Sequence, residues 1–385
     1  MFDILLTASV AFIITFMAIP VIIKVAEEKD LYDIPDERKL HTKLVASLGG
    51  IGIVAGFLLS SLLSIQGYLN PEFQYFYAAI LVVFFIGLKD DIVILSATKK
   101  MLGQIIAASI LIHLGGIRLD SMYGFLGFEQ LPEGFSLALS YLTIIVIINS
   151  FNLIDGIDGL ASSLGILSMV IFGCYFYAID YQSYALFAFA MSGALMAFII
   201  FNHHPAKIFM GDSGSLVLGI INAILVIKFI NVASSPFAAV HIQGAVAIGI
   251  AILFVPLLDT LRVFSIRIVN GRSPFSPDRN HVHHLLLDNG MNQITVTLVC
   301  VAANILFVVM AWFGRFLGSN YLMLVLLCVA FTAVGILFYN NKRRKMAIAR
   351  RLYEDARSDA ASRVVTFVKK SEQVQEETKI AELTK

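Results

Sequence analysis

Polar residues recur every three positions in one otherwise apolar part of the chain, Asn149-Ser-Phe-Asn152-Leu-Ile-Asp155-Gly-Ile-Asp158-Gly. Residues three apart on a helix are neighbours, so successive members can meet, although the drift over nine residues keeps all four off one ideal face. Two amides and two carboxylates suit a hard cation such as Mg²⁺, whereas zinc would favour Cys or His ligands. The run predicts an oxygen-liganded metal site, with a plain polar cap of a helix as the alternative.

Two adjacent carboxylates, Asp90 and Asp91, come shortly after the apolar run 78–88. Their charges repel unless a cation offsets them. A metal ion, Lys89 or Lys100 could supply that cation. Alternatively, the two acids cap the start of the next helix.

Asp212 lies in the stretch Pro205-Ala-Lys-Ile-Phe-Met-Gly-Asp-Ser-Gly-Ser, where an apolar helix is expected to begin. The helix dipole favours its negative charge there, and it could cap the helix with Ser215 as partner. The backbone N–H groups of residues 211–214 could instead hold a phosphate. Phe209 is either a membrane-interface anchor or a platform on which a base stacks.

A further polar stretch reads Ser273-Pro-Phe-Ser-Pro-Asp-Arg279-Asn-His281-Val-His283-His284. Three histidines in four residues could bind a transition metal. Beside a carboxylate-built site, contact with phosphate and sugar is the better interpretation, because imidazolium and guanidinium complement a diphosphate. Pro256, in the apolar segment before this stretch, is expected to break or bend its helix and to open a groove towards lipid.

Apolar helices must position these groups, because 58% of the 385 residues are hydrophobic, 14% are charged and the mean hydropathy is +0.83. Such a composition excludes a soluble globular domain. About 20 apolar residues cross a bilayer as a helix, which predicts an all-α polytopic membrane protein of about 11 transmembrane helices. Residues 1–340 form the transmembrane catalytic domain and residues 341–385 a basic tail. The expected span centres are Ile13, Gly56, Val82, Ile110, Ile145, Met169, Ser192, Asn222, Ile252, Phe307 and Ala330.

The basic residues are distributed asymmetrically between the two sides of this arrangement. The odd-numbered connections and the tail carry all but three of the 28 Lys and Arg residues, the exceptions being Arg118, Lys228 and Arg315. Basic connections stay in the cytoplasm, so we expect an external N-terminus and a cytoplasmic C-terminus. The polar residues described above then lie on the cytoplasmic face.

In combination, these motifs resemble those of the polyprenyl-phosphate N-acetylhexosamine-1-phosphate transferases of glycosyltransferase family 4. The resemblance is to the WecA and TagO branch, with MraY more distantly related, and it covers the chain from Phe2 to about Tyr339. It implies transfer of N-acetylglucosamine-1-phosphate, or a related N-acetylhexosamine-1-phosphate, from a UDP-sugar to undecaprenyl phosphate, with release of UMP. The sequence SPFSPDRNHVHH resembles the version of this motif that points to UDP-N-acetylglucosamine.

The resemblance also implies a setting and a cofactor. The reaction would be the first membrane step of a cell-envelope glycan such as lipopolysaccharide or teichoic acid. It would take place in the bacterial inner (cytoplasmic) membrane, with the active site facing the cytoplasm. Mg²⁺, or Mn²⁺ in its place, would be required.

Site roles carry over residue by residue from the resemblance. Lys100 would face the lipid phosphate, Asn202 and Phe209 would hold the uracil, and the Arg279 region would address the sugar and diphosphate. Direct attack and a covalent intermediate both stay open. The implied catalytic residues are Asp90, Asp91, Asp155 and Asp158; the implied metal ligands are Asn152 and Asp212; the implied substrate-binding residues are Lys100, Asn202, Phe209, Arg279, His281, His283 and His284.

The main alternative is an ion-coupled transporter, in which membrane acids form an ion path. Transporters place such acids near the bilayer midplane, often between repeated halves, and this sequence shows no repeat. Asp259 is the closest to a midplane acid. The tail, beginning Lys342-Arg-Arg-Lys345, is expected to contact anionic lipid. Nothing indicates nucleic acid as a partner, and a homodimer stays open.

Overall fold

The computed structural model describes residues 1–33, 45–271 and 281–383, and it is almost entirely helical. The only strands in these ranges, β1 (Tyr32–Asp33) and β2 (Val45–Ala46), form one short antiparallel pair. The predicted all-α class is confirmed. The helices are α1 (Phe2–Glu28), α2 (Gly49–Ser64), α3 (Glu72–Ile92), α4 (Ala97–His113), α5 (Glu133–Ile154), α6 (Leu160–Ala178), α7 (Gln182–Asn202), α8 (Gly211–Ala233), α9 (Ala245–Ile252), α10 (Phe254–Val269), α11 (Val282–Asp288), α12 (Gln293–Phe313) and α13 (Gly318–Leu383), with 3-10 turns η1 (Phe125–Gly127) and η2 (Arg315–Leu317).

The helices identify a multi-pass membrane protein. Within the described ranges, seven helices are long and apolar enough to cross a bilayer: α1, α5, α6, α7, α8, α12 and the segment 315–355. The bent pair α9 and α10 makes eight if it counts as one span. Every expected span centre falls on a helix, but α2, α3 and α4 do not meet this criterion. The structure therefore supports seven or eight spans by length and composition.

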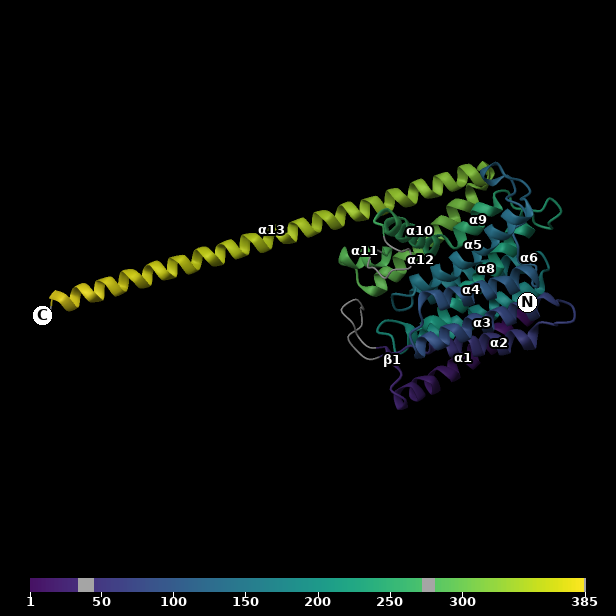
Figure 1. Cartoon of the computed structure of the whole chain (residues 1–385), viewed down its shortest axis with the longest axis horizontal. Coiled ribbons are helices and arrows are strands. Elements are labelled where there is room, and N and C mark those ends of the chain that lie inside the picture. The colour runs from purple at the N-terminus through teal and green to yellow at the C-terminus, as the bar shows by residue number, and fades with distance from the viewer. Residues whose placement is uncertain (34–44, 272–280, 384–385) are drawn as a thin grey trace. The chain divides into compact units, whose positions relative to one another are not determined.

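Helix α8 lies inside the first compact unit, Met1–Phe331, and contacts α2, α3, α5, α6 and α9 (Figure 1). Glycines allow these close approaches. A Cβ at Gly50 of α2 would lie 2.2 Å from the backbone nitrogen of Gly214, and one at Gly87 of α3 would lie 2.5 Å from the carbonyl oxygen of Asp212. Small residues let membrane helices approach backbone to backbone. This packing brings the start of α2 and the last turns of α3 against the start of α8.

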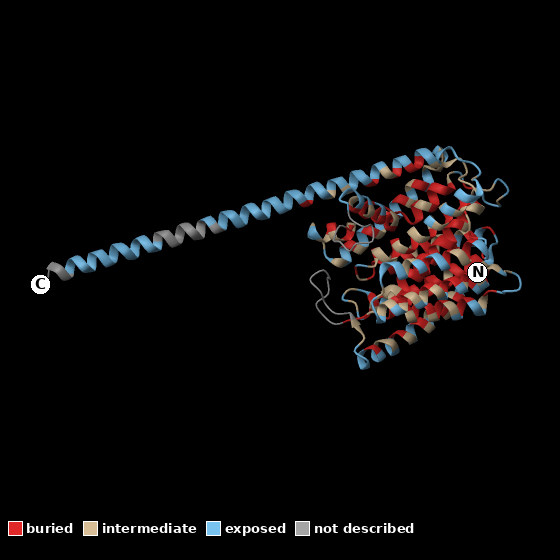
Figure 2. Ribbon diagram, viewed as in Figure 1, coloured by how far each residue is buried: buried red, intermediate tan, exposed pale blue. Residues whose placement is uncertain are grey.

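Side chains are buried mainly where the helices of this unit face one another (Figure 2). Large apolar side chains on the outer faces are exposed, for example Leu5, Met17 and Leu298. In water such a surface would be costly, whereas the hydrocarbon core of a bilayer accepts it. The exposed apolar surface therefore agrees with a membrane environment.

The chain breaks between α9 and α10 as expected from Pro256, with an angle of 82° between the two helices. Pro256 has no N–H to donate to the carbonyl of Ile252. Asn304 of α12 takes over: its Nδ2 donates to Ile252 O at 2.9 Å, and its Oδ1 accepts from Val255 N at 3.0 Å. A buried amide thus satisfies the backbone groups that the break exposes, as a membrane interior requires.

The second compact unit, Thr332–Lys385, is the continuation of α13. Its described side chains are mostly exposed, including Leu352 and Phe367.

Candidate active site

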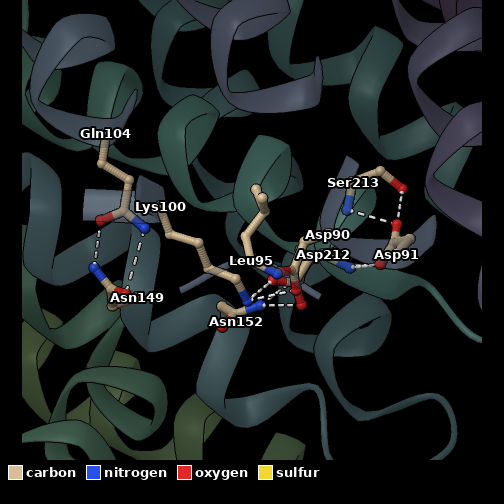
Figure 3. A network of polar contacts seen from close by, with 10 residues as sticks. Asp90, Asp91, Leu95, Lys100, Gln104, Asn149, Asn152, Asp212 and Ser213 are labelled. Atoms are coloured by element: carbon tan, nitrogen blue, oxygen red, sulfur yellow. Dashed lines mark hydrogen bonds and ion pairs between the residues drawn. The ribbon is translucent and has the colours of Figure 1, made fainter. Parts of the chain in front are cut away.

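Lys100 holds two of the expected site carboxylates together (Figure 3). Its Nζ lies 2.6 Å from Asp90 Oδ2 and 2.5 Å from Asp212 Oδ2. Asp90 ends α3, Lys100 lies in the first turn of α4, and Asp212 lies in the first turn of α8. Asp90 also accepts the backbone N–H of Leu95 at 2.5 Å. Lys100, one of the cations expected beside the aspartate pair, therefore lies next to Asp90.

Asp91 points away from Lys100 and caps α8 instead. Its Oδ1 accepts from Asp212 N at 2.7 Å, and its Oδ2 accepts from Ser213 N at 3.0 Å and from Ser213 Oγ at 2.6 Å. Asp91 thus caps a helix, but that helix is α8, which begins 120 residues later, and not the next helix of the chain as the alternative interpretation had it. Asp212 does not cap its own helix through its side chain. Its carboxylate stays directed at Lys100.

The end of α5 contributes two amides to the site. Asn152 Nδ2 donates to Asp212 Oδ1 and to Ser215 Oγ, both at 3.0 Å. One turn earlier, Asn149 forms a reciprocal amide pair with Gln104 of α4, at 2.7 and 3.4 Å. This pair links α4 and α5 one turn away from Lys100 and Asn152. The three-residue spacing therefore places both amides on one side of α5.

Helix α5 ends at Ile154, so Asp155 and Asp158 lie in the turn before α6 and not on the helix. Burial, followed by the charges of Asp212 and Asp91, holds the pKa of Asp155 well above its usual value. Asp158 Oδ2 lies 2.7 Å from His204 Nδ1 and accepts from Ala206 N at 3.1 Å. Asp158 therefore fixes the connection between α7 and α8.

Asn202 is buried and fixes the same connection from the other side. Its Oδ1 accepts from Gly159 N at 2.9 Å, and its Nδ2 donates to Ile208 O at 2.9 Å. The backbone of Phe209 pairs with β2 and α2, since Phe209 N donates to Ala46 O at 2.8 Å and Phe209 O accepts from Gly49 N at 2.9 Å. The amide of Asn202 therefore holds the segment that carries Phe209.

The three histidines of the stretch 281–284 come together at the start of α11. His281 Nδ1 lies 2.7 Å from Asp259 Oδ2, and the His281 and His283 rings stack with centroids 5.3 Å apart. His283 reaches the turn after α5, because a Cβ at Gly156 would lie 2.7 Å from His283 Nε2. Burial lowers the pKa of His283 to about 3, which favours the neutral ring. Arg279 lies outside the described residues, and His284 contacts His283 with centroids 4.4 Å apart.

Comparison with known proteins places this site in a family. The profile of glycosyl transferase family 4 matches residues 73–230. The undecaprenyl-phosphate alpha-N-acetylglucosaminyl 1-phosphate transferase of Escherichia coli (strain K12) is 31% identical over 320 residues, covering 81% of this chain and 84% of the relative. The chain belongs to glycosyl transferase family 4.

Two further relatives support the assignment to this family. The probable undecaprenyl-phosphate N-acetylglucosaminyl 1-phosphate transferase of Bacillus subtilis (strain 168) is 31% identical over 315 residues, covering 78% of this chain and 83% of the relative. The decaprenyl-phosphate N-acetylglucosaminephosphotransferase of Mycobacterium tuberculosis (strain ATCC 25618 / H37Rv) is 30% identical over 363 residues, covering 88% and 84%. The resemblance drawn from the motifs is confirmed.

The family match contains the carboxylate cluster around Lys100 and ends before the histidines at the start of α11. Residues 73–230 run from the start of α3 almost to the end of α8. Within this range the structure brings Asp90, Asp91, Lys100, Asn152 and Asp212 into one network (Figure 3). The family core and the polar network are therefore the same part of the molecule.

Sequence reasoning gave no site role to three residues that hold the site together. Gln104 pairs with Asn149, His204 pairs with Asp158, and Asp259 pairs with His281. Each is a polar residue beside or within an apolar run, which is a signal that could have singled it out. Its partner could not be found that way, because the pairs are separated by 22 to 46 residues.

Proposed function

We propose that the chain transfers N-acetylglucosamine-1-phosphate from UDP-N-acetylglucosamine to undecaprenyl phosphate and releases UMP, as the first membrane step of cell-envelope glycan synthesis. The observation that carries this proposal is the network in which Lys100 joins Asp90 and Asp212 beside Asn152. The relatives from E. coli and B. subtilis are named for the same acceptor and sugar. No described feature favours the transporter alternative. The acid closest to the midplane, Asp259, is buried against His281, with Oδ2 at 2.7 Å from His281 Nδ1.

The reaction requires charge neutralisation more than bond-making by the protein. A phosphate oxygen of the acceptor forms a bond to the phosphorus that carries the sugar, and the bond from that phosphorus to the bridging oxygen breaks, so the bridging oxygen leaves with UMP. Negative charge develops on the transferred group and on UMP. Lys100 can offset it while the protein positions both substrates.

The two adjacent aspartates have different roles in this proposal. Asp91 uses both oxygens to accept three hydrogen bonds from α8, so its role is to fix the start of that helix. Asp90 shares Lys100 with Asp212, and an acceptor phosphate can compete for that ammonium group. Asp90 is therefore the better placed of the two to meet the acceptor.

The donor set suits Mg²⁺. Among the described residues, no group of three His, Cys, Asp or Glu side chains could form a metal cage. Mg²⁺ does not need such a cage, because one or two carboxylates, substrate phosphates and waters complete its shell. Asp212 and Asn152 would hold the ion. When bound, it would supply Lewis-acid neutralisation of the diphosphate, and Mn²⁺ could replace it.

The protein has an apolar cavity that could take the isoprenoid chain of the acceptor. This cavity of about 300 Å³ lies between α5, α8, α9, the start of α10 and the connection from α4 to α5, with Val146, Ile147, Val226 and Val246 in its wall. Ile147 lies five residues before Asn152 on α5, which is about 7.5 Å along the helix axis. An isoprenoid chain in this cavity would approach the carboxylate network from inside the membrane.

The remaining membrane assignments follow from the charge pattern. We propose eleven spans, counting α2, α3 and α4, with an external N-terminus and the site on the cytoplasmic face of the bacterial inner membrane. Residues 1–340 are the catalytic domain, and the tail 341–385 contacts anionic lipid through its first basic residues. The network itself is built from one chain, so a homodimer would not be needed to complete it.

The test is release of UMP by the purified protein from a panel of UDP-sugars, with undecaprenyl phosphate as acceptor. We expect UDP-N-acetylglucosamine to be used and chelation of divalent ions to abolish turnover, with Mg²⁺ or Mn²⁺ restoring it. Use of a different UDP-N-acetylhexosamine alone would refute the sugar and leave the reaction class. Full turnover in the presence of chelator would refute the metal.

A further inference from the structure

A buried acid on α10 fastens the histidine segment to the membrane body. Asp259 is 1% exposed and uses both carboxylate oxygens: Oδ2 faces His281 Nδ1 at 2.7 Å, and Oδ1 accepts from Val282 N at 2.7 Å. His281 is the N-cap residue of α11, and its side chain does not cap that helix. Asp259 therefore satisfies the first N–H of α11 from a different helix, where a negative charge is favoured by the helix dipole.

The contact with His281 also fixes where that ring carries its hydrogen. An ionised carboxylate can only accept, so Nδ1 of His281 is the donor. The ring then stacks parallel on His283, with 5° between the planes. His283 in turn lies against Gly156, between the two acids of the turn after α5. A series of contacts thus runs from Asp259 through His281 and His283 to Gly156, the residue that follows Asp155.

We propose that Asp259 is a positioning residue for the transfer reaction: it sets the tautomer of His281 and the start of α11, and so holds His283 against the turn of Asp155 and Asp158. This inference rests on the proposed function. It gives Asp259 a role different from an acid in an ion path. It also gives two of the histidines different roles. His281 contacts Asp259, whereas His283 contacts the turn after α5.

Asp259→Asn separates positioning from folding. The asparagine Oδ1 can still accept from Val282 N, so α11 keeps its cap. Its NH₂ group, however, would face His281 Nδ1, so the ring must accept there and carry its hydrogen on Nε2. We expect a melting temperature close to that of the wild type and a fall in kcat of about 10²-fold, because small misplacements near the reacting groups have effects of that size.

His281→Asn is the second variant, and it keeps a donor for Asp259 while it removes the ring that stacks on His283. We expect a similar loss from it, and no further loss in the double variant, because residues that act as one unit are not additive. The matched control is Glu72→Gln, since Glu72 accepts from Tyr184 OH at 3.2 Å in the other half of the unit. Its turnover should equal that of the wild type.

Wild-type release of UMP in the same assay tests the proposed function separately. Given wild-type turnover, near-normal kcat in Asp259→Asn or in His281→Asn would overturn the inference alone. Losses that add in the double variant would overturn it too, since independent effects are not one positioning unit. If Asp259→Asn does not fold, His281→Asn with the native acid decides the question.

Discussion

At the residue scale, Asp212 is a carboxylate that we expect to be needed for turnover and not for the stability of the fold. Its two oxygens meet Lys100 and Asn152, while Asp91 caps the helix on which it lies. Removal of its charge therefore leaves the cap of α8 in place. It takes away half of the negative charge that holds Lys100 and the negative charge of the only anionic residue among the two expected ligands of the metal.

We predict that Asp212→Asn slows turnover by about 10² to 10⁴-fold, which corresponds to roughly 3 to 5 kcal/mol of transition-state stabilisation. The measurement is turnover across a Mg²⁺ titration, with melting temperature in detergent as control. The melting temperature should change little, because the change is isosteric and α8 keeps its cap. Near-normal turnover at low Mg²⁺ would remove Asp212 from the metal site.

For Asp155 we expect that loss of the carboxylate raises the stability of the fold while it lowers turnover. An acid whose pKa is higher in the folded state binds its proton more tightly there, so stability is lost as pH rises above the unfolded value of about 3.9. The pKa of Asp155 is held well above its usual value by burial and neighbouring acids. The ionised form is therefore the costly one.

Asp155→Asn removes that cost, and we predict that its gain in melting temperature over the wild type grows from pH 5 to pH 8. If Asp155 takes part in proton transfer, turnover falls by about 10²-fold or more at the same time. Thermal unfolding at several pH values checks the first statement, and UMP release checks the second. A gain that does not depend on pH would contradict the assignment of the raised pKa.

At the element scale, the site depends on how closely α3 and β2 approach the start of α8. Gly211 has φ of +70°, and a Cβ there would lie 2.4 Å from Ser47 O and 2.7 Å from Asp91 Oδ2. Both the backbone conformation and the lack of space require glycine at this position. The same junction holds the hydrogen bonds from Asp212 N and Ser213 to Asp91.

We predict that Gly211→Ala lowers the free energy of unfolding by about 1 to 3 kcal/mol, because a non-glycine residue in the left-handed region is strained. Turnover should fall as well, since Asp91 must move. Gly134→Ala in the first turn of α5 is the control, because nothing lies within 4 Å of its Cβ. Equal melting temperatures for the two variants would show that the junction can relax.

At the scale of the whole molecule, the charge pattern makes a prediction about topology. A cysteine placed at Ser371 in the tail should resist a membrane-impermeant thiol reagent in intact cells and react after permeabilisation. Gln66→Cys, in the exposed connection after α2, should react in intact cells. Both variants should be made in a background without Cys174, Cys300 and Cys328. The reverse labelling pattern would place the site on the wrong side for a cytosolic nucleotide sugar.

The sequence by itself determined the helices and the chemical groups. Apolar length is a local property, so each expected span centre fell on a helix, and Pro256 correctly marked the broken pair α9 and α10. The three-residue spacing of Asn149 and Asn152 likewise placed both amides on one side of α5, because that spacing is a property of the helix itself. The motifs were sufficient to recognise the family for the same reason, since they lie within short stretches.

Only the tertiary structure decided which groups meet and which task each one has. Asp90 and Asp91 are neighbours in sequence, yet one binds Lys100 and the other caps α8. Asp259, which the sequence marked only as the closest to a midplane acid, contacts His281. Such pairings are fixed by the packing of helices whose small residues allow close approach, and a charge or hydrogen-bond partner at that distance leaves no trace in the local pattern of either segment.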